Sequence, residues 1–220
     1  MLKCSIPSFS LDFLVFTETW LNNSFHDNEL GFTRYNVYRC DRNEKTSSLN
    51  RGGGVLIAIK NTFNSNLLNI DTLNVEQVFI KVLLNNLIII ICAVYNSDVQ
   101  LYLNHLSVIE SLVCTYPNSK FIVCGDYNIP SLTWVSGKTG LKCFNFISST
   151  TGQSLIEGFS LLNFIQFNNI VNSSGNILDL IFTSIHDTLI NPCIDPLVPI
   201  DPYHPVRPNK LQATHSHTQS

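Results

Sequence analysis

The chain has few charged residues and no excess of positive charge. Only 13% of its 220 residues are charged, and the formal net charge is −3 at pH 7. Proteins that bind nucleic acids through phosphates need positive surface, so any such surface here must be local. The chain is also 45% hydrophobic. It can therefore bury a substantial core, and extended disorder is excluded for most of its length.

Signals for membranes and secretion are missing as well. The longest uninterrupted apolar run, residues 87–95, is well short of the roughly 20 residues that a membrane helix requires. The first residues lack the basic region and clean apolar core of a secretory signal. We therefore expect a soluble, intracellular protein, nuclear or cytoplasmic, that is not secreted and has no membrane partner.

Two motif classes are absent. The seven cysteines include no Cys-x-x-Cys pair, which argues against a disulfide framework or a zinc knuckle and favours reduced, mostly buried thiols. The stretch Ser136-Gly137-Lys138-Thr139 has Leu132 where a phosphate-binding loop needs glycine. A nucleotide triphosphatase is excluded on that ground.

Alternating and apolar segments predict a strand-rich fold. The expected strands span about residues 12–17, 35–40, 53–60, 76–84, 87–95, 120–125, 164–168 and 177–183. Helical spacing is present at residues 99–115 and, more weakly, at 152–162. The segments 76–84 and 87–95, joined by Asn85-Asn86, read as an antiparallel hairpin and argue against a purely parallel sheet. A two-sheet sandwich with outer helices fits best.

The most informative motif is Gly125-Asp126-Tyr127-Asn128, directly behind the apolar run 121–124. A buried strand that ends on this motif presents Asp126 and Asn128 on one face, because strand side chains alternate. A carboxylate and a carboxamide so placed can hold and deprotonate a water beside a phosphate. A plain turn is the competing interpretation, since Gly, Asp and Asn are common turn residues.

Two more carboxylates lie in apolar surroundings: Glu18 ends the run 13–16, and Asp179 lies within 177–183. Isolated buried carboxylates are costly, so they call for a common partner. In order, the series Glu18, Tyr95, Asp126 with Asn128, Asp179 and His204 resembles the active site of the endonuclease/exonuclease/phosphatase superfamily. The motifs most like the endonuclease domain of non-long-terminal-repeat retrotransposons are Thr17-Glu18-Thr19-Trp20-Leu21, Arg51-Gly52-Gly53-Gly54-Val55, residues 174–179 and residues 201–205.

The resemblance implies an α+β fold, a four-layered α/β sandwich of two mixed, mainly antiparallel sheets flanked by helices. It implies a Mg²⁺-dependent endonuclease that nicks DNA, with Mn²⁺ as a substitute metal and no small-molecule cofactor. The catalytic residues would be Asp126, Asn128, His204, Asp179 and Tyr95; the metal ligands Glu18 and Asp201; and the substrate-binding residues Arg51 and Asn128.

Two departures from the family pattern stand out. Only about ten residues precede the strand that ends at Glu18, so the family's first strand and helix are expected to be missing. Pro202-Tyr203 replace the family's Ser-Asp before His204, which leaves Asp201 as the nearest carboxylate. We expect one domain over residues 1–206, an N- and C-terminally truncated copy, and a disordered tail over 207–220.

Residues 34–51 contain five basic and two acidic side chains. This local excess of positive charge is either a DNA-facing surface or simply a solvated basic loop. Two other functions stay open. The chain could be a catalytically impaired remnant with no enzymatic role, or a lipid or inositol phosphate phosphatase of the same superfamily. The sequence leaves the oligomeric state open.

Overall fold

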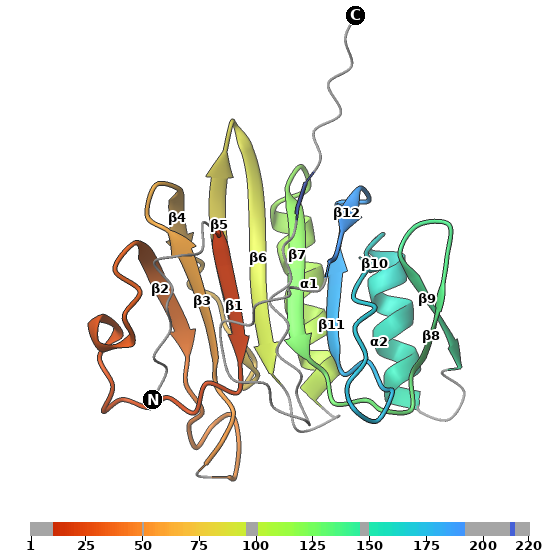
Figure 1. Ribbon diagram of the computed structural model, residues 1–220, viewed down its shortest axis with the longest axis horizontal. Helices are drawn as coiled ribbons and strands as arrows, with labels where there is room; N and C mark the ends of the chain where they lie inside the picture. The colour runs from red at the N-terminus through yellow and green to blue at the C-terminus, as the bar shows by residue number, and fades with distance from the viewer. Residues whose placement is uncertain (1–10, 50, 96–100, 146–149, 192–211, 214–220) are drawn as a thin grey trace, which may run out of the picture.

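The computed structural model describes residues 11–49, 51–95, 101–145, 150–191 and 212–213, which form two packed sheets with helices against one of them (Figure 1). The larger sheet has the strand order β4-β5-β6-β7-β11-β10-β9-β8. These strands are β4 (Asn64–Leu67), β5 (Glu76–Leu84), β6 (Leu87–Tyr95), β7 (Lys120–Asp126), β11 (Asp179–Thr183), β10 (Ile165–Gln166), β9 (Leu141–Asn145) and β8 (Thr133–Ser136). The smaller sheet has the order β1-β3-β2, formed by β1 (Phe13–Thr17), β3 (Val55–Lys60) and β2 (Tyr35–Cys40).

The centre of the larger sheet is the β5–β6 hairpin. Its turn residues Asn85 and Asn86 have φ values of 48° and 67°, the left-handed conformation that a tight hairpin needs and that asparagine tolerates. Alternate residues of β5 face opposite layers: Val78 packs between the two sheets, and Phe79 packs in the core on the other face. Because both faces of these strands are covered, their sequences are nearly continuous runs of apolar residues.

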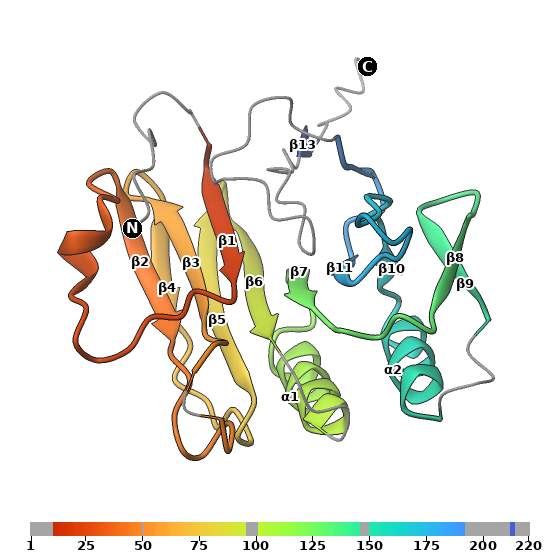
Figure 2. The ribbon, with the colours of Figure 1, turned by 60° about the horizontal axis from the view of Figure 1, so that its bottom comes forward.

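Two helices cover the outer face of the larger sheet (Figure 2). They are α1 (Tyr102–Thr115), which connects β6 to the parallel strand β7, and α2 (Thr150–Leu161), which precedes β10. Their buried residues, including Ile109 and Phe159, share one core with β7 and β11. The ring of Phe159 stacks on Phe182 with centroids 4.0 Å apart.

The smaller sheet is covered on both faces. Phe13 and Val15 pack toward the larger sheet, while Leu14 of the same strand packs outward. The outer core also contains Phe32 and, at its margin, Leu30 of the 3₁₀-helix η2 (Asp27–Leu30). The segment around η2 therefore forms the outermost layer beside the small sheet.

The predicted fold class, an α+β four-layered sandwich, is confirmed. Every strand pair is antiparallel except β6–β7. Each predicted strand and helix has a counterpart, although the strand expected at 164–168 shortens to the two residues of β10. The sequence analysis missed η2, β4, β8, β9 and the short ladder of β12 (Thr188–Leu189) with β13 (Gln212–Ala213).

Several expectations concern residues outside the described part of the chain. The first ten residues are among them, so the absence of a first strand stays a prediction. Of the tail expected at 207–220, only β13 is described. Within the described residues, no helix has the length and apolarity needed to cross a membrane. The five described cysteines are free thiols, of which Cys92 is buried and Cys114 exposed.

A buried polar network lies between α1 and the larger sheet. His105 is fully buried, with Nδ1 at 2.6 Å from Gln77 Oε1 and Nε2 at 3.0 Å from the hydroxyl of Tyr127. Burial raises the pKa of the Tyr127 hydroxyl, so it stays protonated and donates to Nε2. Nδ1 then holds the proton that is donated to Gln77. The network fixes Tyr127, the residue between Asp126 and Asn128.

We expect the stability of the protein to depend on His105 below neutral pH. Burial lowers the pKa of His105 from 6.5 to about 3. Folded protein therefore keeps the ring neutral, whereas the unfolded chain takes up a proton as pH falls below its ordinary pKa. Stability is complete above that value and is lost progressively on acidification. Between about pH 7.5 and about pH 5 the loss should be about 2 kcal/mol.

The measurement is urea unfolding of wild type and His105→Gln, which keeps a donor and an acceptor but does not titrate. The advantage of wild type over His105→Gln should shrink by that amount at the lower pH. The matched control is His186→Gln, which makes the same substitution at an exposed position. Parallel pH profiles for wild type and His105→Gln would contradict a neutral, buried His105.

Candidate active site

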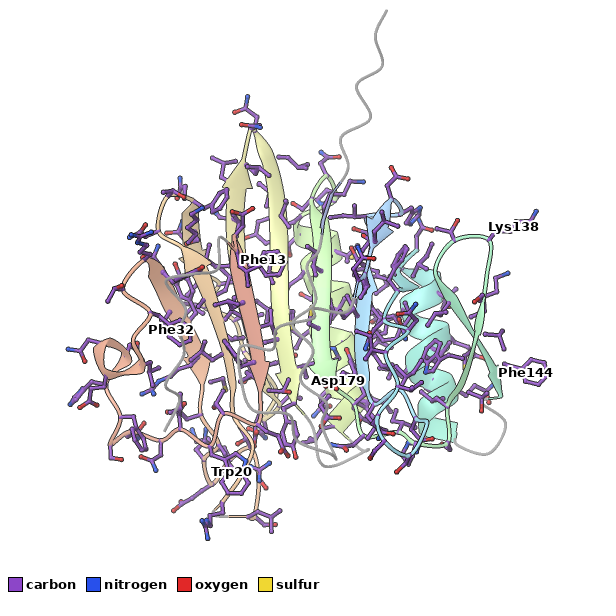
Figure 3. All side chains as sticks on the ribbon, viewed as in Figure 1. Phe13, Trp20, Phe32, Lys138, Phe144 and Asp179 are labelled. Carbon is purple, nitrogen blue, oxygen red and sulfur yellow. The ribbon has the colours of Figure 1, made fainter. Side chains whose placement is uncertain are left out.

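One edge of the sandwich brings acidic and phenolic side chains into a row. The strand register pairs Tyr95, the last residue of β6, with Asp126, the last residue of β7. Asp126 is paired in turn with Asp179, the first residue of β11. Directly paired residues project from the same face of a sheet, and Tyr95 packs in the core between the sheets. The row therefore lies at the strand ends, on the face of the larger sheet that packs against the small sheet. Figure 3 labels its last member, Asp179.

Glu18 joins this row from the small sheet. It follows the last residue of β1 and has a left-handed backbone, with φ of 51°. The hydroxyl of Tyr95 donates a hydrogen bond to Glu18 Oε1 at 2.5 Å. The bond spans the two sheets, so residues 77 positions apart in the chain meet at one point.

The electrostatic surroundings of Tyr95 show the same convergence. Its pKa is raised well above the ordinary value, first by burial, then by the hydrogen bond to Glu18 and the charge of Glu18, and further by the charge of Asp126. The positive charge of Arg42, whose guanidinium carbon lies 5.5 Å from the ring centroid, acts in the opposite direction. Tyr95 therefore remains a protonated hydroxyl, a hydrogen-bond donor between two carboxylates.

Asp126 and Asn128 are in contact, but for a different reason than strand alternation. The strand ends at Asp126, and Asn128 lies beyond it with φ of 48°. The Asn128 backbone N–H donates to Asp126 Oδ1 at 3.0 Å, and Asn128 Nδ2 donates to Oδ2 at 3.1 Å. The expectation of a shared strand face was thus wrong, because the aspartate side chain bonds the backbone two residues on and turns the chain. Asp126 itself is buried.

The backbone at this strand end is close-packed. A Cβ atom at Gly125 would collide with the carbonyl oxygen of Val94 on the neighbouring strand β6. Glycine therefore permits the close approach of β6 and β7 next to Asp126.

Asp179 lies half-buried at the start of β11. Its carbonyl oxygen accepts a hydrogen bond from Asn168 Nδ2 at 2.6 Å. The pKa of the Cys124 thiol is raised to about 12, first by burial and then by the negative charge of Asp179. Asn168, buried behind the strand, was not singled out from the sequence, since asparagine at the end of a short strand is an ordinary loop residue.

His204 and Asp201 lie outside the described residues. The contact expected between His204 and Asp179, and the role of Asp201 as a second metal ligand, stay predictions. Arg51 is described: it is exposed and lies over the ring of Trp20, with its guanidinium carbon 5.6 Å from the ring centroid.

A buried ion pair beside the row was missed from the sequence. Arg42 Nε lies 2.6 Å from Glu76 Oε1, and the two side chains are only 7% and 3% exposed. Glu76 is paired in register with Tyr95, so it extends the row by one strand. The signal was present, because Glu76 opens a mostly apolar strand and an isolated carboxylate there is costly.

The Arg42–Glu76 pair fixes the glycine turn before β3. Arg42 Nη1 donates to the carbonyl of Arg51 at 2.8 Å, and Glu76 Oε2 accepts the N–H of Gly54 at 2.7 Å. Gly52, Gly53 and Gly54 all have positive φ, as expected for the predicted tight turn into the strand. A side chain at Gly53 would collide with the guanidinium of Arg42 and with Glu76.

The glycine turn also holds the backbone that follows Glu18. The N–H of Thr19 donates to the carbonyl of Gly54 at 3.2 Å, and the N–H of Trp20 donates to Gly53 at 2.9 Å. Through these bonds the Arg42–Glu76 pair sets the backbone position on which the Glu18 carboxylate depends.

The donor set at this edge consists of oxygen atoms. Among the described residues, no three His, Cys, Asp or Glu side chains gather closely enough to form a metal cage. Magnesium does not need one, since it usually binds through one or two carboxylates and keeps several waters. Glu18 Oε1 accepts from Tyr95, and a carboxylate has further acceptor positions. The site thus fits a hard, largely hydrated cation held chiefly by Glu18.

The family model described as endonuclease-reverse transcriptase matches residues 89–197. This stretch begins in β6 and contains Tyr95, Asp126, Asn128 and Asp179. Over residues 89–197 the chain thus matches an endonuclease family, and its fold is that of the endonuclease/exonuclease/phosphatase superfamily. No curated protein sequence matches it.

Solved structures of this superfamily share the fold. The endonuclease domain of TRAS1, a telomere-specific non-LTR retrotransposon, has a TM-score of 0.65 at 11% identity, covering 96% of this chain and 90% of that domain. A superfamily protein from Leptotrichia buccalis has 0.53 at 13%, covering 85% and 80%. The human Nocturnin catalytic domain with bound sulfate has 0.51 at 15%, covering 84% and 73%. At these identities the likeness establishes the fold, and the reaction must be argued from the site.

Proposed function

We propose that the chain is a Mg²⁺-dependent phosphodiesterase that nicks DNA. The observation that supports it most is the contact of Tyr95 with Glu18 at the end of a strand whose register continues to Asp126 and Asp179. The fold and the family of the chain are those of nucleases and phosphodiesterases. The structural relative named as a retrotransposon endonuclease domain makes DNA the favoured substrate.

Asp126 takes the proton of the attacking water in this proposal. Its two oxygens accept hydrogen bonds from Asn128, which orient the carboxylate toward the attacking water in this proposal. Asn128 uses Nδ2 for this bond, so its Oδ1 remains to orient a water or to meet a donor. The bound cation would supply positive charge that stabilises the phosphorane-like transition state and the leaving oxygen.

Tyr95 binds the scissile phosphate. A phenol has one O–H, and that of Tyr95 is donated to Glu18. A phosphate oxygen can accept this proton only if the hydroxyl turns away from Glu18, so substrate binding frees a carboxylate oxygen for the cation. His204, held by Asp179, would add a second positive charge beside the phosphate.

The proposal is tested with purified protein and supercoiled plasmid. Mg²⁺ should support conversion to the nicked circle, Mn²⁺ should substitute, and EDTA should abolish the reaction. A catalytically impaired remnant would leave the plasmid intact and show no saturable Mg²⁺ binding by calorimetry that depends on Glu18. A lipid or inositol phosphate phosphatase would release phosphate from those substrates and not nick DNA. Either result would overturn the proposal.

Removing the Tyr95 hydroxyl should slow nicking while leaving the fold intact. Tyr95→Phe keeps the ring in the core but deletes the donor, and loss of one such donor typically costs about 100-fold in rate. The matched control is Tyr38→Phe, because Tyr38 also packs between the sheets but donates its hydroxyl to the carbonyl of Ser65 at 2.8 Å. Its nicking rate should stay within about twofold of wild type. Equal rates for the two variants would exclude Tyr95 from the reaction.

A further inference from the structure

Trp20 is unusually placed for so large an apolar side chain. It is 54% exposed, and its backbone is left-handed with φ of 55°. The conformation is held by the hydrogen bond from its N–H to the carbonyl of Gly53. It lies two residues after Glu18, on the edge of the molecule where Asp179 is also found (Figure 3). The aromatic ring is therefore held in place and open to a ligand beside the candidate site.

The ring of Trp20 is supported by the glycine turn. A Cβ atom at Gly52 would lie 3.9 Å from the indole nitrogen, so the ring sits closely against the turn. The guanidinium carbon of Arg51 lies 5.6 Å from the ring centroid. Because the Arg42–Glu76 pair holds the same turn, the aromatic ring and the cation are presented on a fixed backbone.

Arg51 is a cation that remains available beside Trp20. Two arginines earlier in the chain are neutralised: Arg39 pairs with Asp27 at 3.1 Å and with Asp41 at 3.6 Å, and Arg42 pairs with Glu76. Arg51 makes no ion pair within the part of the chain that the structure describes. Of the five basic residues in 34–51, Arg39 and Arg42 are thus paired within the protein, whereas Arg34, Lys45 and Arg51 are exposed. Arg51 is the one whose guanidinium lies over the ring of Trp20.

We infer that Trp20 and Arg51 form a stacking platform for an unpaired nucleobase of the bound DNA strand. The inference rests on the proposed function and adds the form in which that site takes its substrate. The Arg51 guanidinium lies over the Trp20 ring, so a base can stack on the indole–guanidinium pair, and the guanidinium also attracts the adjoining phosphate. The fixed backbone lowers the ordering cost of binding. A basic protein partner is disfavoured, because Arg51 would repel it.

The test uses the intrinsic fluorescence of Trp20. The chain has two tryptophans, and Trp134 is half-buried against Phe182, with ring centroids 6.4 Å apart. In Trp134→Phe the signal comes from Trp20 alone. Titration in EDTA with a short duplex that has one unpaired thymine should quench it in a saturable way. The same duplex with an abasic site at that position should quench it much less.

Binding is then compared by fluorescence anisotropy of the labelled duplex. Trp20→Ala should weaken binding by about 10-fold, the usual effect of losing one stacked base. The matched control Phe25→Ala removes another exposed aromatic of the same segment, 44% exposed, and should bind as wild type does. Arg51→Met should weaken binding and reduce its salt dependence. Arg34→Met is its control, since Arg34 is exposed and precedes β2 at the opposite edge.

Quenching that is equal for the unpaired and abasic duplexes would overturn the inference, as would equal affinities of Trp20→Ala and Phe25→Ala. Quenching by anionic lipid vesicles but not by DNA would replace the nucleobase with a lipid headgroup and overturn it too. Because these titrations contain no metal, they do not depend on catalysis. If the protein nicks DNA but its binding does not depend on Trp20, only the stacking platform is contradicted. If it binds DNA through Trp20 but does not nick, only the proposed reaction is contradicted.

Discussion

Asp126→Asn is expected to lower the rate of plasmid nicking by a factor of about 100 or more. The variant keeps the size of the side chain but removes its capacity to take a proton. The turn should survive, because the Oδ1 atom of the introduced asparagine can still accept the N–H of Asn128, which lies 3.0 Å from Asp126 Oδ1 in the wild type. The side-chain amide of Asn128 would flip, so that its oxygen faces the new amide. Initial rates under excess Mg²⁺ measure the effect.

The matched control for this prediction is Asp187→Asn. Asp187 is exposed in the segment after β11, and β11 begins at the site edge and runs away from it. The same chemical change there should leave the rate within about twofold of wild type. If Asp126→Asn nicks as fast as Asp187→Asn while circular dichroism shows both folded, another group must accept the proton.

Arg42→Met is expected to lower the free energy of unfolding by about 3–5 kcal/mol. The guanidinium is 7% exposed and Glu76 is 3% exposed, so the substitution leaves a carboxylate buried without its partner. Water cannot compensate at that depth, and the glycine turn also loses the bond to the Arg51 carbonyl. Urea unfolding followed by circular dichroism gives the measurement.

Two further variants isolate the origin of that loss. Arg42→Met combined with Glu76→Gln should recover part of it, because glutamine removes the buried charge and still accepts the N–H of Gly54. Lys60→Met is the surface control: Lys60 lies 3.7 Å from Asp12, with side chains 32% and 65% exposed, and should cost less than about 1 kcal/mol. Similar losses for Arg42→Met and Lys60→Met would show that the Arg42–Glu76 pair is not a buried ion pair in solution.

Local patterns predicted the centre of the fold well. The apolar runs on both sides of Asn85-Asn86 and the helical spacing predicted at residues 99–115, where α1 spans Tyr102–Thr115, come from short-range constraints, namely turn geometry and one-sided burial. The strands β8 and β9 were missed because they are the last two strands at one end of the larger sheet and include exposed residues such as Val135 and Phe144. Polar and poorly buried strands give little alternation to detect.

The site was predicted in part, and each difference has a physical cause. Glu18, Asp126 and Asp179 were singled out as carboxylates in apolar surroundings and Tyr95 through the family resemblance. The strand register brings Tyr95, Asp126 and Asp179 together. The contact of Asn128 was expected from alternation but arises from a turn. Arg42 was counted as surface charge, since its burial depends on Glu76, 34 residues away, a pairing that no local pattern reveals.

Because the row lies on paired backbone, the distance between its members is inherited from the sheet. Neighbouring strands lie about 4.8 Å apart, so Tyr95, Asp126 and Asp179 together measure about 10 Å from end to end. The strand pairing therefore fixes the spacing of these three side chains, and that spacing stays the same when nearby loops change in length. A shift of β7 by a single residue would turn Asp126 toward the helices and remove the middle carboxylate from the row.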